Sequence, residues 1–134
     1  MAKEMKLVGS HFTKMSAERN DNFKGKIELS QNLQINSFEK VEGSKEVIKV
    51  GYLLDIDYKE LGKISIEGLV FVSADAKKVK EMVKSWEDKK LNAQEYAAIT
   101  NLIIQKATIR ALELEEEFRL PIHIRLPTVE LKKN

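Results

Sequence analysis

The stretch that decides the fold is VIKVGYLLDIDY, residues 47–58, in which apolar and other side chains alternate. The even-numbered positions of this stretch are apolar or aromatic: Ile48, Val50, Tyr52, Leu54, Ile56 and Tyr58. A period of two over this length is typical of a β-strand with one buried face. We therefore expect a sheet at the centre of the fold.

The neighbouring segments are predicted to pair with this strand. Residues 59–62 form a short connection to a second alternating segment, residues 64–72. So short a loop requires the two strands to pair antiparallel. Residues 7–19 contain β-compatible side chains and are predicted to be the first strand.

A fourth strand is predicted in residues 24–41, where the odd positions are mostly apolar from Ile27 to Ile35. Phe38 falls on the opposite parity. One extra residue moves every later side chain to the other face of a strand. A bulge or bend at residues 36–37 would therefore reconcile the two halves.

Two helices are predicted after the sheet. From Val79 to Trp86 apolar residues recur at i, i+3, i+4 and i+7, which indicates a short helix at about residues 74–88. A longer helix is predicted at about residues 92–119. It is expected to end before Pro121, because proline cannot continue a helix.

The long helix carries more apolar surface than one sheet contact requires. Leu102 and Ile109 lie well around the helix axis from Ile99 and Ile103. This surplus predicts a second burial partner for the helix. Residues 120–134 contain two prolines and are predicted to be an extended tail.

The chain is thus predicted to be one α+β domain over residues 1–134. Its sheet has four antiparallel strands within residues 7–72, followed by the short helix, the long helix and the extended C-terminal tail. A chain of this length can build a single hydrophobic core.

The composition fits a folded cytoplasmic protein. Hydrophobic residues at 43% and charged residues at 33% place the chain among globular rather than disordered sequences. The lack of cysteine excludes disulfides, thiolate nucleophiles and cysteine-ligated metals. Residues 1–6 lack the apolar run of a signal peptide, and no stretch is long enough to span a membrane, so no membrane insertion is expected.

No catalytic residue, metal site or cofactor is predicted. His11 and His123 lack the spacing that places two imidazoles on one helix face. Asp55 and Asp57 project from one strand face about 7 Å apart, which could serve a cation or an acid–base pair. A solvated sheet face explains the two carboxylates better. No phosphate-binding loop, nucleophile elbow or dinucleotide fingerprint occurs.

Two charge clusters have ordinary explanations. Lysines between Lys77 and Lys90 give the short helix a basic face, which acidic residues interrupt. Glutamates from Glu113 to Glu117 oppose the dipole at the end of the long helix, and Arg110 and Arg119 are the candidates to compensate them. An acidic patch for a basic partner is the functional alternative.

The most informative residues are apolar ones predicted on the outer face of the sheet. Leu53, Leu69 and Phe71 lie there, and Phe38 could join them after the bend. Several such side chains on adjacent strands form a patch that monomers rarely leave open. Self-association and the binding of other polypeptides both explain the patch, and symmetry favours self-association.

The predicted order of elements resembles the SecB export chaperone and its archaeal and toxin–antitoxin-associated relatives. The resemblance rests on the strand end ISIEGLVFV at residues 64–72, the long helix over residues 96–118 and the closing prolines at 121 and 127. It implies a dimer or tetramer that holds unfolded chains in apolar grooves without ATP. It also makes Leu53, Leu69 and Phe71 candidate groove or interface residues, and the long helix a subunit-packing element. Export SecB proteins are acidic, whereas this chain is slightly basic, with a pI of about 8.7.

The first functional hypothesis is therefore a non-catalytic, oligomeric protein that binds unfolded or partner polypeptides. Its candidate interface residues are Phe38, Leu53, Leu69, Phe71, Leu102 and Ile109. The alternative is a small nucleic-acid-associated protein that uses the basic helix, although a charge excess of only two makes nucleic acid an unfavoured partner. A further alternative is an enzyme with a pocket between subunits.

Overall fold

The computed structural model describes residues 5–124 of the chain. Four strands are followed by two helices, as the sequence predicts, and the α+β architecture is confirmed. The elements are β1 (Lys6–Arg19), β2 (Ser30–Lys40), β3 (Val47–Asp57), β4 (Gly62–Ser73), α1 (Ala76–Glu87) and α2 (Ala93–Glu117), with one short 3-10 turn, η1 (Lys59–Leu61), between β3 and β4. The last ten residues of the predicted tail lie outside the described residues.

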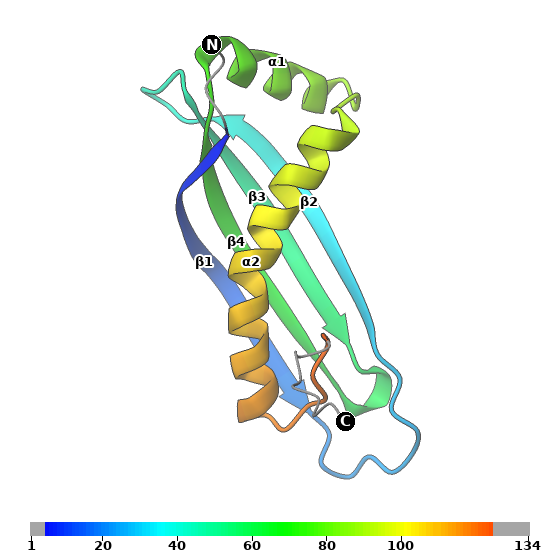
Figure 1. The fold of residues 1–134 in the computed structure, drawn as a ribbon. Coiled ribbons are helices and arrows are strands. Elements are labelled where there is room, and N and C mark those ends of the chain that lie inside the picture. Colours follow the sequence, from blue (N-terminus) through cyan, green and yellow to red (C-terminus); the bar gives the residue numbers. More distant parts are fainter. Residues whose placement is uncertain (1–4, 125–134) are drawn as a thin grey trace, which may run out of the picture.

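The sheet is antiparallel throughout and has the strand order β1-β4-β3-β2. Both helices lie on the same face of it (Figure 1). We call this face the inner face and the opposite one the outer face. Helix α2 crosses the strands obliquely, whereas α1 crosses one end of the sheet and contacts β2 and β3.

The inner face carries the parity that the sequence predicts. The side chains of β3 from Ile48 to Ile56 on this parity are buried, and so are their apolar neighbours on β4. They are covered by α2, which meets the sheet along a stripe formed by Ile99, Ile103, Ala107, Ala111 and Leu114. The two alanines of the stripe let the helix backbone approach the sheet closely.

The register of β2 confirms the predicted bulge and corrects one predicted position. The register shift falls between Ile35 and Ser37. After it, Ile35 and Phe38 face the same side, so Phe38 is 3% exposed in the core and does not join the outer face. Its ring stacks on Trp86 of α1, with 5.5 Å between ring centroids. The bulge thus supplies the aromatic contact that holds α1 on the sheet.

The strand predicted to begin at residue 24 begins at Ser30 instead. The physical reason is that β3 ends at Asp57, which is opposite Ser30, so residues before Ser30 have no partner strand. Ile27 and Leu29 are consequently exposed side chains of a loop.

Helix α2 begins as the sequence predicts. The side chain of Asn92 accepts a hydrogen bond from the backbone N–H of Gln94 at 2.7 Å, which caps the helix. The C-terminal end is closed by Arg119, whose positive φ of 53° turns the chain back toward the sheet. The N–H of Leu120 then donates to the carbonyl of Glu115 at 2.8 Å.

Gly68 is the position on β4 where a side chain is excluded. A Cβ there would lie 2.6 Å from the Tyr52 hydroxyl oxygen and 2.9 Å from the carbonyl oxygen of His11. We expect Gly68→Ala to lower the free energy of unfolding by about 1–3 kcal/mol, because the tyrosine ring and the backbone of β1 must both shift. Urea denaturation measures the change.

Gly9→Ala is the matched control for this prediction. A Cβ at Gly9 would meet Phe71 at an ordinary 3.6 Å. This variant is expected to change stability by less than about 1 kcal/mol. Equal effects of the two substitutions would contradict the packing of Tyr52 over Gly68.

Candidate functional site

Helix α2 leaves a groove along the β1 margin of the inner face. We call it the β1-side groove. It holds a cavity of about 340 Å³ lined by Phe12, Tyr52, Lys106, Ile109 and Arg110, among others. Ile109 is 62% exposed and Phe12 is 37% exposed, so large apolar side chains on both walls face solvent.

Among the described strands, β1 is an edge of the sheet with β4 as its one neighbour, and Phe12 of β1 lines the β1-side groove. Register shifts occur between Leu7 and Gly9 and between Phe12 and Lys14. They leave Val8 and Thr13 as bulge residues without a partner on β4. Met15 lies two residue pairs beyond Phe12 in the ladder with β4, on the same inner face, and is 40% exposed. The edge therefore offers unpaired backbone groups beside exposed apolar side chains.

The outer face of the sheet carries the apolar cluster predicted from the sequence. We call Leu53, Leu69 and Phe71 the outer-face cluster. All three are half-buried, and residues paired directly across the ladder place them on the same face. The ring of Phe71 lies over Gly9 and 5.8 Å from the ring of His11. The cluster thus continues onto the outer face of β1.

The two predicted positions on α2 have different surroundings. Leu102 is half-buried and packs against the core of its own chain. Ile109 extends into the β1-side groove. The surplus apolar surface of α2 consists mainly of Ile109 on one side and Ile104, which is 45% exposed, on the other.

On the β2 side, residues 120–124 lie on the inner face next to the C-terminal half of α2 (Figure 1). We call them the strap. A cavity of about 770 Å³ borders its first residues and is lined by Phe23, Ile27, Leu61 and Leu112, among others. A second cavity of about 240 Å³ borders His123 and Ile124 and is lined by Leu33, Leu54 and Ile104, among others.

Three buried ionisable side chains meet beneath the strap. Glu115 is fully buried in the last turn of α2. One of its carboxylate oxygens accepts a hydrogen bond from the Tyr58 hydroxyl, and the other lies 2.8 Å from His123 Nδ1. The His123 side chain is only 2% exposed. We call these residues the Glu115 cluster, and its hydrogen bonds compensate the burial of a carboxylate.

The burial and the Glu115 carboxylate have a clear effect on Tyr58. Burial of the phenol raises its pKa above the ordinary value, and the hydrogen bond and negative charge of Glu115 raise it further. The hydroxyl therefore stays protonated, and can donate to Glu115, beyond the pH at which an ordinary tyrosine ionises.

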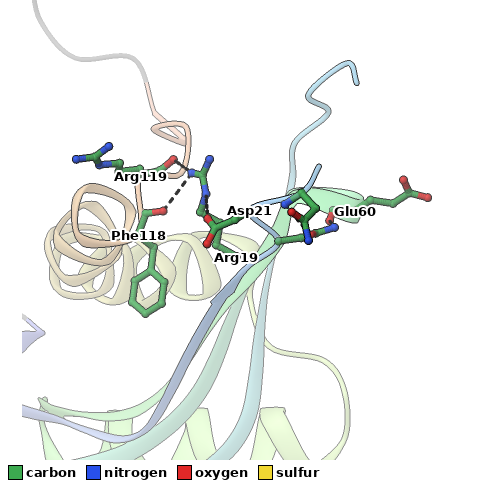
Figure 2. Close-up of polar contacts among 7 residues, drawn as sticks. Arg19, Asp21, Glu60, Phe118 and Arg119 are labelled. Atoms are coloured by element: carbon green, nitrogen blue, oxygen red, sulfur yellow. Dashed lines mark hydrogen bonds and ion pairs between the residues drawn. The ribbon is translucent and has the colours of Figure 1, made fainter. Parts of the chain in front are cut away.

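Arg19 closes the C-terminal end of α2 (Figure 2). Its Nη1 donates to the carbonyl oxygens of Phe118 and Arg119, while its Nε contacts Asp21 at 3.1 Å. A guanidinium at this position satisfies carbonyls that the helix leaves free and compensates the negative end of its dipole. Arg110 bonds Glu113 at 3.1 Å, as predicted, but the cation at the helix end comes from β1.

The other candidates from the sequence have structural partners. Asp55 accepts a hydrogen bond from Ser65 at 2.8 Å, and Asp57 accepts one from the backbone of Lys59 at 2.8 Å. The two histidines are not brought together, since His11 lies on β1 and His123 beneath α2. Among residues 5–124, no three histidine, aspartate or glutamate side chains gather as metal ligands.

Helix α1 shows an exposed lysine face. Lys77, Lys80 and Lys84 are exposed, whereas Lys78 pairs with Glu95 of α2 at 3.0 Å. No helix of the described part of the chain is long and apolar enough to cross a membrane.

The Glu115 cluster was not predicted, although the position of Glu115 on the helix could have indicated it. Glu115 follows Ala111 by four residues and so continues the buried stripe of α2. A carboxylate on a buried stripe needs a buried partner. Nothing local in the sequence identifies His123 or Tyr58 as that partner, because both approach from other elements.

Comparison with known proteins places the fold. No family model matches the chain, and no curated protein matches it in sequence. Among solved structures it is similar to a SecB-like chaperone of Mycobacterium tuberculosis in complex with a ChAD peptide from the HigA1 antitoxin. The match has a TM-score of 0.52 and 12% sequence identity, and it covers 94% of this chain and 88% of that one. The fold is therefore SecB-like, as the order of elements predicts.

The hydrogen bond between Tyr58 and Glu115 can be tested through pH. Below about pH 10, Tyr58→Phe is expected to lower the free energy of unfolding by about 1–3 kcal/mol, because a buried carboxylate oxygen loses its donor. Above about pH 10 the Tyr58 phenol ionises in the unfolded chain but stays protonated in the folded protein. This ionisation stabilises the unfolded state of the wild type and lowers its free energy of unfolding, whereas the variant has no phenol at this position. The difference in free energy of unfolding between the wild type and Tyr58→Phe should therefore narrow by up to about 1.4 kcal/mol per pH unit.

Urea denaturation at pH 8, 10 and 11 measures this gap. Tyr96→Phe is the control, since Tyr96 is 41% exposed and lies outside the Glu115 cluster. It is expected to match the wild type at every pH. A gap between Tyr58→Phe and the wild type that stays constant up to pH 11 would contradict the prediction.

Proposed function

We propose that this protein binds unfolded or partner polypeptides without catalysis, and that it does so as a homo-oligomer. The observation that carries the proposal is the grouping of exposed apolar side chains along α2 and β1, beside an unpaired strand edge. Such a combination is suited to another polypeptide, because backbone groups and apolar side chains are presented together. The similar M. tuberculosis chaperone, which was solved with a bound peptide, supports the same class of ligand.

We assign the β1-side groove to a second copy of the chain. Two β1 strands related by a twofold axis can pair antiparallel, and Ile109 and Phe12 of each copy would then be covered. A paired edge would also satisfy backbone groups that are open in the single chain. This accounts for the exposed apolar surface on the β1 side of α2, where Ile109 lies.

Pairing through β1 would also enlarge the outer-face cluster. The cluster lies on β4 and β3, and β4 is the neighbour of β1. In the dimer two such clusters would share one continuous sheet face, separated by about three strand spacings, or roughly 14 Å. We assign this face to client polypeptides, since a single extended chain can reach both clusters.

Self-association is tested with Ile109→Ser. Size-exclusion chromatography with light scattering should show that the wild type is at least a dimer at micromolar concentration and that the variant dissociates roughly tenfold more readily, the equivalent of about 1.4 kcal/mol. Ile104→Ser is the matched control, because it makes the same change on the same helix, at 45% exposure, on the opposite groove. It should keep the wild-type mass. A monomeric wild type at 100 μM would exclude the assignment.

Client binding is tested by the aggregation of reduced insulin, monitored by light scattering. The wild type should suppress aggregation at near-stoichiometric ratios, and Leu69→Ser with Phe71→Ser should require roughly tenfold more protein, because buried apolar anchors dominate binding. Lys63→Ser, a polar change on the same strand and the same face, should act like the wild type. Aggregation that the wild type does not slow would refute the proposed function.

A further inference from the structure

The strap divides one longer groove into two cavities. Leu120, Pro121 and Ile122 line the larger cavity, and His123 and Ile124 line the smaller one. Helix α2 forms one wall of both cavities, and the opposite wall is the loop before β2 with η1 in the larger cavity and β2 with β3 in the smaller one. An extended segment that replaced the strap would therefore meet a single channel between α2 and the β2 margin of the sheet.

Among residues 5–124, the strap has two buried attachment points. Leu120 is 5% exposed, and the His123 side chain is 2% exposed. Ile122 and Ile124, by contrast, are 49% and 36% exposed. Within the described residues, Ile122, His123 and Ile124 make no backbone hydrogen bond to any strand. The contact of His123 with Glu115 is thus the main fastening beyond Leu120.

The channel has the chemistry of a polypeptide site. Its apolar walls include Leu33, Leu54 and Ile104. Strand β2 borders it and pairs only with β3 among the described strands, so its second edge is free to bond an extended chain. Thr100 also lines the smaller cavity, and its buried hydroxyl has no hydrogen-bond partner within residues 5–124. A polypeptide backbone supplies the polar groups that the strap does not.

We propose that residues 120–124 are a displaceable strap that occupies a second polypeptide site, and that an extended apolar segment displaces it when the contact between Glu115 and His123 opens. The inference rests on the proposed function, since the ligand is again an unfolded chain. The strap itself, with isoleucines at alternate positions, shows the kind of segment that the channel accepts. Fastening the strap lowers the apparent affinity in proportion to the fraction of molecules that are closed.

The experiment measures binding of a fluorescein-labelled peptide with the sequence of residues 118–126 by fluorescence anisotropy. His123→Ser is expected to bind this peptide at least tenfold more tightly than the wild type, because the strap is unfastened. Gln105→Ser, a change at an exposed position of α2 that lines neither cavity, should bind like the wild type. If His123→Ser does not fold, Glu115→Gln with His123→Ser removes the buried charge together with its partner and takes its place.

Proton NMR gives an independent readout, because the chain has two histidines. Saturating wild type with the peptide should move the His123 ring signal to the position of an exposed imidazole. Equal affinity of the wild type and the unfastened variant, a peptide that binds neither, or an unmoved His123 signal in the complex would overturn the strap. Suppression of insulin aggregation by the wild type is measured separately, so loss of the strap would leave the proposed function standing.

Discussion

The structure depends on one contact, that of helix α2 with the inner face of the sheet. The helix and the strands are similar in length, since 25 residues of helix extend about 38 Å and 11 residues of strand about 36 Å. They do not match in width. An α-helix is about 10 Å across, whereas four strands place the outer two about 14 Å apart before their side chains are counted. One helix therefore cannot cover this sheet.

The two uncovered margins differ in what lies beside them. On the β1 margin, exposed apolar side chains face solvent next to an open edge. On the β2 margin the chain returns after α2, and the strap covers part of the space. The turn that makes this return possible is held by Arg19, which ties the end of the helix to the end of β1 (Figure 2). The two margins of the sheet thus differ because the chain reverses direction after α2.

Most of the fold could be predicted because its signals are local. Strand parity, the bulge in β2 and the ends of both helices follow from residues close together in the sequence. Where prediction failed, the decisive contact was distant. Phe38 could be placed on either face from the sequence, because its partner, Trp86, lies on another element. The loop before Ser30 was read as strand because its alternation could not show that β3 ends opposite that residue.

The candidate sites were predictable to a smaller extent for the same reason. Ile109 was recognised as surplus from its angle on the helix, and Leu53, Leu69 and Phe71 from their parity on the sheet. The grooves, the strap and the Glu115 cluster each require three elements to meet. Arg19 and Arg119 are a hundred residues apart in the sequence, and no local pattern pairs a residue near the start of the chain with one near its end.

The bulges at Val8 and Thr13 have a consequence for assembly. Each bulge interrupts the regular ladder and increases the local twist of the edge strand. Such an edge can pair with the same edge of a second copy along the short regular stretch between the bulges, because twofold symmetry gives the two strands the same twist. It cannot template one flat strand after another. If two copies pair through β1 as proposed, the bulges keep this apolar edge from adding further strands and restrict the pairing to a closed dimer.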